Sequence, residues 1–151
     1  MLPRLSNVPQ LNNVVSDYLS ELQKQHFEGD IASNYADRLS LSTDNSVYQQ
    51  LPQAILFPKS VADVVRITKL ANQEKYLHLT FTPRGGGTGT NGQSINNNII
   101  VDLSRHMTGI LELNIEERWV RVQAGVVKDQ LNQFLKPHGL FFAPELSTSN
   151  R

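Results

Sequence analysis

The chain has 151 residues, and its 14 basic and 14 acidic side chains give a formal net charge of zero. Without a basic excess to attract phosphate backbones or anionic lipids, we expect a small-molecule partner rather than a nucleic acid or a membrane surface. The absence of cysteine excludes disulfides and cysteine-ligated clusters within these residues, and the absence of an apolar run of about 18 residues or a signal peptide predicts a cytoplasmic chain.

The first periodic segment runs from Leu11 to Leu22, with apolar residues spaced as on one face of a helix. We expect this helix to end near Gly29, because glycine adopts the left-handed cap at little cost. Residues 30–50 are polar and weakly periodic, and are expected to form a loop with short helical turns in which Tyr48 packs. Residues 1–50 are therefore predicted to be a helical arm and loop, and residues 51–151 a separate ligand-binding domain.

A strand, a helix and a second strand are predicted next. Ala54–Phe57 is a short apolar strand, Ser60 and Asp63 resemble a capping box at the start of a helix, and Leu77–Phe81 returns as a strand. Two strands joined by one helix are expected to be parallel with a right-handed crossover. The loop after the second strand would then lie at the carboxyl edge of the sheet, where open α/β sheets bind ligands.

The remaining elements have a different pattern. A strand at residues 99–103 is followed by two strands, residues 109–114 and 119–123, whose short connection predicts an antiparallel hairpin. A helix follows, with Val127, Leu131, Phe134 and Leu135 on one face, and closes at residues 137–139. We predict a subdomain boundary near Ser104.

Five of the nine glycines lie within eight residues, from Gly85 to Gly92. Glycine can adopt positive φ and lets the backbone approach an anion, so this run is typical of a phosphate cradle, and Pro83 holds Thr82 extended in front of it. The alternative is a flexible linker. Linkers are not usually placed between two strongly apolar strands, and this favours the cradle.

The loop differs from two common phosphate-binding motifs. A P-loop needs Lys and then Ser or Thr after its last glycine, whereas Gly92 is followed by Gln93 and Ser94. The spacing from Gly87 to Gly92 matches G-x-G-x-x-G, but a Rossmann site needs a helix beginning within that motif. Residues 94–100 have no helical period, so that interpretation would require an unpredicted helix after Gly92.

Few other residues are candidates for chemistry. The four histidines are scattered, and neither a G-x-S-x-G elbow nor an H-E-x-x-H motif is present. His106 follows the end of a strand and is the one histidine placed to approach a ligand. Arg84 has two open roles, pairing with a phosphate or anchoring the loop to a carboxylate. Asp102 is either a buried acceptor for glycine N–H groups or a solvent-facing strand end.

The strand, the loop Pro83–Gly89 and the strand that ends at Leu103 resemble the vanillyl-alcohol oxidase and para-cresol methylhydroxylase superfamily of FAD-linked oxidoreductases. The resemblance covers about 110 residues, from Ser40 onward, and is closest to the N-terminus of large bacterial FAD and iron–sulfur enzymes of the D-2-hydroxyglutarate dehydrogenase type. Further matching segments are Thr43–Asp44, Tyr48, Pro52–Pro58, Ser60–Val65, Val120–Gly125 and Gly139–Pro144.

The resemblance implies an α+β fold, namely a para-cresol methylhydroxylase-type FAD-binding domain. It implies an N-terminal βαβ subdomain and the start of a second subdomain with an antiparallel sheet, and a domain that is incomplete at its C-terminus. It implies that the FAD pyrophosphate is lined by Arg84, Gly85, Gly86, Gly87, Thr88, Gly89 and Thr90. Thr88 stands where members with covalent flavin often have a histidine, which implies noncovalent FAD. Pro144 and Ser147 match the start of a second flavin-contacting stretch.

The implied reaction is hydride transfer from a D-2-hydroxy acid, of the D-2-hydroxyglutarate or D-lactate type, to flavin N5, with an electron acceptor downstream. No residue of this chain is a convincing catalytic base or metal ligand, so those groups and any iron–sulfur cluster are expected elsewhere in a longer protein. The alternative is a truncated, non-catalytic fragment or a nucleotide-binding or assembly module without activity of its own.

Overall fold

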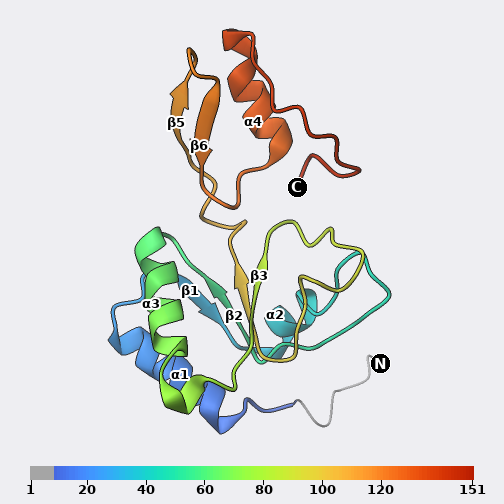
Figure 1. Ribbon diagram of the computed structural model, residues 1–151. Helices are drawn as coiled ribbons and strands as arrows, with labels where there is room; N and C mark the ends of the chain where they lie inside the picture. Colours follow the sequence, from blue (N-terminus) through green and yellow to red (C-terminus); the bar gives the residue numbers. More distant parts are fainter. Residues whose placement is uncertain (1–8) are drawn as a thin grey trace.

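Two sheets of different size organise the chain in the computed structural model, which describes residues 9–151 (Figure 1). The strands are β1 (Asp30–Ala32), β2 (Ala54–Phe57), β3 (Phe81–Arg84), β4 (Ile99–Asp102), β5 (Ile110–Asn114) and β6 (Trp119–Val122). The helices are α1 (Asn13–Lys24), α2 (Tyr35–Ser40), α3 (Val61–Ala71) and α4 (Lys128–Leu135), with 3-10 turns η1 (Glu74–Tyr76) and η2 (Lys136–His138).

The larger sheet has the strand order β1-β2-β4-β3. Strands β2 and β3 both run parallel to β4, while β1 is antiparallel to β2, so the predicted parallel β-α-β unit is confirmed with β4 inserted between its strands. The chain between β3 and β4, residues 85–98, must therefore return along the whole sheet before pairing begins. Parallel neighbours need a connection of about a dozen residues, and here that connection is the glycine-rich loop.

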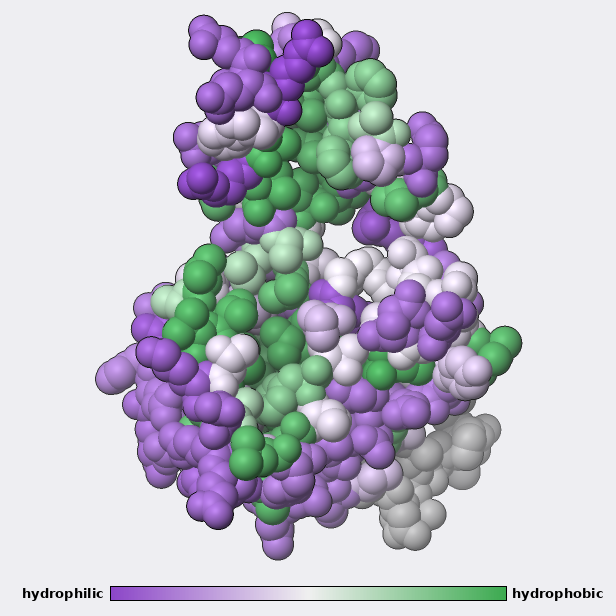
Figure 2. Space-filling view, in the orientation of Figure 1, coloured by the Kyte–Doolittle hydropathy of each residue, from purple (hydrophilic) through white to green (hydrophobic). Residues whose placement is uncertain are grey.

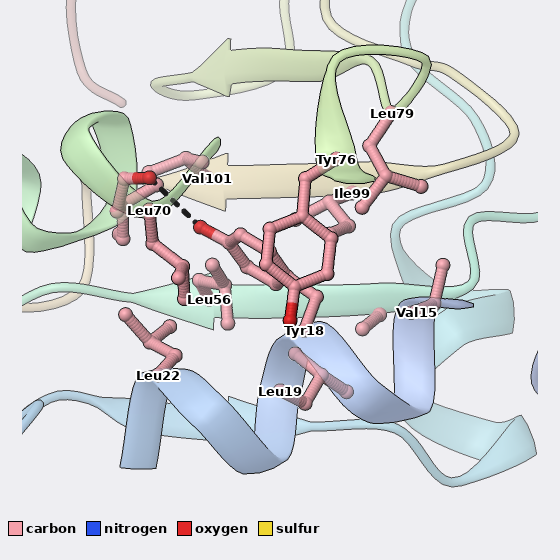
Figure 3. Close-up of a cluster of buried hydrophobic side chains, with 12 residues drawn as sticks. Val15, Tyr18, Leu19, Leu22, Leu56, Leu70, Tyr76, Leu79, Ile99 and Val101 are labelled. Carbon is pink, nitrogen blue, oxygen red and sulfur yellow. Dashed lines mark hydrogen bonds between the residues drawn. The ribbon is translucent and has the colours of Figure 1, made fainter. Parts of the chain in front are cut away.

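The core lies on the face of this sheet that α1 and α3 cover (Figures 1 and 3). Tyr18 of α1 is fully buried at its centre, where its hydroxyl donates a 2.9 Å hydrogen bond to the carbonyl of Ile67 in α3. Its ring meets Tyr76 edge-on, with centroids 5.1 Å apart. A smaller cluster, Ile55, Phe57 and Ile100, lies on the opposite face.

Burial of Tyr18 predicts a loss of stability in alkali. Desolvation, with a smaller contribution from Tyr76, raises the pKa of Tyr18 above its ordinary value. A raised pKa in the folded state gives stability that is complete below about pH 10 and is lost as the pH rises from there toward the folded pKa. Tyr18→Phe should cost about 1 kcal/mol at neutral pH through its lost hydrogen bond and should decline less steeply above pH 10. Urea unfolding at several pH values checks this against the exposed Tyr48→Phe; parallel pH profiles for wild type and Tyr18→Phe would disprove it.

The first helix ends earlier than predicted. α1 stops at Lys24, and the left-handed conformation is taken by His26 (φ 58°) rather than by Gly29, so the expected cap at Gly29 is wrong. Glycine is needed at position 29 for a different reason. A Cβ there would collide with the Phe27 ring and with the carbonyl oxygen of Phe57 at the end of β2.

Residues 30–50 contain more structure than the predicted loop. The helical turn is confirmed as α2, but β1 was not predicted. Tyr48 is 58% exposed, with its ring against Gly92 rather than packed within residues 30–50. The predicted strand at 77–81 is also wrong over most of its length. Leu77 is 63% exposed after turn η1, and β3 begins only at Phe81 and continues through Pro83 to Arg84.

The predicted start of α3 is confirmed. Ser60 caps the helix by accepting a hydrogen bond from the Asp63 N–H at 3.2 Å. The Asp63 carboxylate is fully buried and accepts from the N–H groups of Glu28 and Lys59, both at 3.0 Å, so it ties α3 to the chain before β1. Arg66 adds an ion pair at 3.1 Å.

The C-terminal elements follow the predicted order. Strands β5 and β6 form the antiparallel hairpin, and Gly139 adopts φ 68° directly after η2. In Figure 1 this hairpin and α4 lie together at one end of the molecule, beyond the carboxyl ends of β2, β3 and β4. The division of the chain at residue 51 and near Ser104 stays a prediction, although α1 and β1 share the core and the sheet with β2 to β4.

Candidate functional site

The segment named here the glycine loop, residues 85–94, leaves the carboxyl end of β3, as predicted. No helix follows it: within residues 9–151 the chain after Gly92 makes turns and enters β4 at Ile99. The Rossmann interpretation, which requires a helix at that point, is therefore wrong.

Backbone conformation favours glycine at two positions of this loop, and close contacts limit the room for a side chain at others. Gly87 (φ 65°) and Gly92 (φ 74°) are left-handed, which confirms the expectation of positive φ in the loop. A Cβ at Gly87 would strike the Arg84 guanidinium, and one at Gly89 would strike the Gln93 side chain. Gly86 has no positive φ, but a Cβ there would lie 2.6 Å from the backbone of Arg151.

The loop offers a row of unused donors. Among residues 9–151, no hydrogen bond uses the backbone N–H groups of residues 85–90, whereas the N–H of Asn91 donates to Gln93 Oε1 at 3.0 Å. Consecutive N–H groups without protein acceptors are suited to an anion, because each one would otherwise need water. These donors fit a phosphate group.

Arg84 fastens the loop from its side chain. Its Nη2 donates to the Thr43 carbonyl at 3.0 Å and its Nη1 to the Ser94 carbonyl at 3.3 Å. Of the two roles left open for Arg84, the carboxylate anchor is wrong, because both acceptors are backbone carbonyls and no ion pair within residues 9–151 involves Arg84. Its positive charge is therefore not neutralised by a carboxylate, and pairing with a phosphate stays a prediction.

A cavity of about 330 Å³ lies between the glycine loop and the C-terminal segment. Its walls are Thr88, Gly89, Thr90, Gln93, Leu146, Ser147 and Thr148. The structure thus brings Ser147 beside the loop, while Pro144 is exposed and outside the cavity wall. A hydrogen bond of 3.0 Å from the Asp129 N–H to the Ser149 carbonyl holds this segment against α4. Ligand pockets usually have volumes of about 300 to 1,000 Å³.

The surface around this cavity is polar. Figure 2 shows pale and purple surface over the glycine loop, while green apolar surface gathers over α3 and the neighbouring strands. That apolar area includes a hollow of about 430 Å³ lined by Ile67, Phe81, Val101 and neighbouring residues. A charged group is better accommodated at the glycine loop, since burying an ion among apolar side chains is costly.

Asp102 has neither of its two predicted roles. It is buried, but its Oδ1 accepts from the N–H and the hydroxyl of Ser104, at 2.9 and 2.7 Å, rather than from the glycine loop. His106, the histidine placed to approach a ligand, instead lies with its Nε2 2.7 Å from Asp30 Oδ2. Hydrogen bonds, first from His106 and then from Lys59, lower the pKa of the Asp30 carboxyl. The contact between Asp30 and His106 links β1 to the turn after β4.

Sequence reasoning missed the contacts between the glycine loop and residues 43–48. Ser94 donates a hydrogen bond to Asp44 Oδ2 at 3.0 Å, and the Arg84 bond to Thr43 runs to the same segment. Asp44 and Ser94 are 50 residues apart and belong to segments without periodicity, so no local pattern could have paired them.

Within residues 9–151, no group of three or more His, Cys, Asp and Glu side chains is arranged to hold a metal ion. Within the same residues, no helix combines the length and the apolar character needed to cross a membrane.

Comparison with known proteins identifies related sequences and folds. The family model described as FAD binding domain matches residues 52–151. A D-2-hydroxyglutarate dehydrogenase of Haemophilus influenzae is 83% identical over all 151 residues, which are 15% of that protein's length. Two solved structures share the fold. Alkyldihydroxyacetonephosphate synthase superposes with a TM-score of 0.79 at 18% identity, over 95% of this chain and 29% of that one. p-Cresol methylhydroxylase superposes with a TM-score of 0.64 at 17% identity, over 85% of this chain and 25% of that one.

Proposed function

The chain belongs to the FAD-binding domain family, and from this we propose that its glycine loop binds the pyrophosphate of FAD in an enzyme that oxidises a D-2-hydroxy acid. The expected α+β fold of the para-cresol methylhydroxylase type is confirmed. The residues proposed for FAD are Arg84, Gly85, Gly86, Gly87, Thr88, Gly89, Thr90 and Ser147, with Pro144 proposed only for the following stretch.

The observation that carries this proposal is the row of unused N–H donors on residues 85–90, beside a polar cavity. Four positions of the same loop have no room for a side chain without displacing a neighbour: Gly86, Gly87, Gly89 and Gly92. Hydrogen bonds to charged groups contribute about 1.5 to 3 kcal/mol each. Several such bonds from the loop N–H groups would stabilise a bound pyrophosphate. The positive charge of Arg84, which no carboxylate pairs with among residues 9–151, would add a favourable electrostatic interaction.

The residues of this chain bind and orient the cofactor. They do not supply the base that removes the proton of the substrate hydroxyl. Bound FAD supplies a two-electron acceptor: the substrate's carbinol carbon loses a hydride and its hydroxyl loses a proton, which yields a 2-oxo acid. Within residues 9–151, no histidine or carboxylate lines the cavity beside the loop. We place the base, the substrate ligands, the route to an electron acceptor and any iron–sulfur cluster in the rest of a longer, cytoplasmic protein.

Thr88 predicts that the flavin is noncovalent, because a threonine hydroxyl does not form the flavin bond that histidine forms in covalent members. Acid precipitation of the full-length protein should release all of its flavin into the supernatant. Absorbance at the flavin bands and fluorescence of the washed pellet measure the two fractions. Flavin fluorescence that stays with the denatured polypeptide would contradict the prediction.

The reaction is tested by following dye reduction by the full-length FAD-loaded protein with D-2-hydroxyglutarate, L-2-hydroxyglutarate and D-lactate. We expect turnover with a D-2-hydroxy acid and at least tenfold less with the L-enantiomer. The 151-residue chain alone should show none, because ligand immobilisation costs at least about 4 kcal/mol and this half-site offers few contacts to offset it. A full-length protein that binds FAD but reduces the dye with neither D-acid would overturn the assigned reaction and leave the FAD site standing.

A further inference from the structure

We propose that residues 43–48, named here the strap, are a positioning element of the cofactor site that holds the glycine loop in its phosphate-binding shape, with Asp44 as the key residue. The inference rests on the proposed FAD function and deepens it, because it assigns a role in the cofactor site to residues that lie outside both the glycine loop and the cavity wall. In Figure 1 the strap is the cyan segment that lies next to the yellow-green loop after β3.

Three contacts join the strap to the loop. The Thr43 carbonyl accepts from Arg84 Nη2 at 3.0 Å, and the Asp44 carboxylate accepts from the Ser94 hydroxyl at 3.0 Å. At the far end of the strap, the Tyr48 ring lies against Gly92, where a Cβ would be 3.0 Å from Tyr48 Cδ2. The strap therefore contacts the residue directly before the loop, the last residue of the loop and one left-handed position within it.

Hydrogen bonds within and around the strap hold its own conformation. Thr43 pairs with Gln49 in an antiparallel bridge, and the Gln50 N–H donates to the Ser42 carbonyl at 2.9 Å. Within the turn, the Ser46 N–H donates to Asp44 Oδ1 at 2.9 Å. The pKa of Asp44 lies below its ordinary value, chiefly because Ser46 and then Ser94 donate hydrogen bonds to it, so the carboxylate stays ionised at neutral pH.

Asp44 acts through Ser94 and the turn of the strap rather than on the ligand. Neither Asp44 nor any other strap residue lines the cavity beside the loop. An anion above the loop would gain nothing from a direct contact with this carboxylate, since like charges repel. Its stabilising effect is to reduce the conformational freedom that residues 85–94 would otherwise lose on binding FAD.

The test measures FAD affinity of the full-length apoprotein in Asp44→Ala, Asp44→Asn, Ser94→Ala and the Asp44→Ala/Ser94→Ala double variant. Loss of one hydrogen bond to a charged group corresponds to an affinity loss of about 10- to 100-fold. We expect each single variant to weaken FAD binding at least about tenfold, and the double variant to be no weaker than the poorer single one, because both remove the same contact. Ser94→Thr keeps the hydroxyl and should keep the affinity.

The matched control is Glu112→Gln, which removes an exposed carboxylate and its 3.2 Å ion pair with Arg121 on the β5–β6 hairpin. A positioning role predicts that the apoprotein melting temperature changes no more in the strap variants than in this control, and that saturating FAD restores kcat. A purely structural role would instead lower the melting temperature of the apoprotein.

The outcomes separate the two proposals. Wild-type affinity in both Asp44→Ala and Ser94→Ala, or additive losses in the double variant, would overturn the strap and leave the FAD site intact. If Asp44→Ala does not fold, Asp44→Asn and Ser94→Ala carry the same test. Wild-type protein that binds no FAD would overturn the proposed function and the strap's role with it.

Discussion

Gly87→Val in the full-length protein should abolish tight FAD binding while the apoprotein stays folded. Gly87 is left-handed at φ 65°, and a Cβ there would collide with the Arg84 guanidinium. Strain at such a position costs about 1 to 3 kcal/mol for a residue other than glycine, and valine is among the least tolerant. Displacing Arg84 also breaks its bonds to Thr43 and Ser94. We therefore expect FAD affinity to fall by about 100-fold or more, measured by flavin fluorescence titration of the apoprotein.

Gly139→Val is the matched control for this prediction. Gly139 has nearly the same backbone conformation, φ 68°, but a Cβ there meets no atom within 4 Å, so the substitution introduces the strain without a collision. It should lower stability by a similar amount and leave FAD affinity unchanged. Gly86→Val is expected to weaken binding as well, because its side chain would push against Arg151. Equal FAD affinity in Gly87→Val and Gly139→Val would refute the cradle and favour a flexible linker.

Asp63→Ala should lower the free energy of unfolding by about 3 kcal/mol or more. The carboxylate is fully buried, and its removal leaves the N–H groups of Glu28 and Lys59 without acceptors and Arg66 without its ion pair. Each N–H group left without an acceptor costs about 1 to 3 kcal/mol. The lost ion pair adds about 1 kcal/mol or less, because the Arg66 side chain is 31% exposed and water can hydrate its charge. Urea unfolding of the domain monitored by circular dichroism measures the change.

Two variants calibrate that experiment. Asp63→Asn keeps one of the two acceptor oxygens. Its free energy of unfolding should therefore fall by roughly half as much as in Asp63→Ala. Glu112→Ala removes an exposed ion pair and should cost less than about 1 kcal/mol. A loss in Asp63→Ala no larger than that in Glu112→Ala would show that the buried carboxylate does not tie α3 to the chain before β1.

Local sequence patterns predicted the elements whose stability is decided locally. The cap at Ser60, the hairpin of β5 and β6, and the close of α4 at Gly139 each depend on residues within a few positions of one another. Strand β1 was missed because it has only three residues and is held by pairing with β2. The strand predicted at residues 77–81 was wrong over most of its length, since Leu77 faces solvent directly after turn η1.

The candidate site was predictable only in part. The glycine run located the loop, because glycine spacing is a local signal. The partners of Arg84 and Asp102 were not predictable, since they depend on which backbone carbonyl or turn lies nearby after folding. The position of β4 between β2 and β3 was not predictable from sequence order either, although its four residues are all buried, as in a central strand.

Pro83 has a consequence for the behaviour of this protein in concentrated solution. Strand β3 is an edge of the larger sheet, and its residues 80 and 84 turn their carbonyls toward β4, accepting from Ile99 and Leu103. Position 83, of the opposite parity, directs its backbone away from β4. Proline at that position removes a donor from the open edge without weakening the ladder, and this discourages edge-to-edge strand pairing and aggregation. Pro83→Val should therefore increase self-association through β3 and would place a second polypeptide beside the glycine loop.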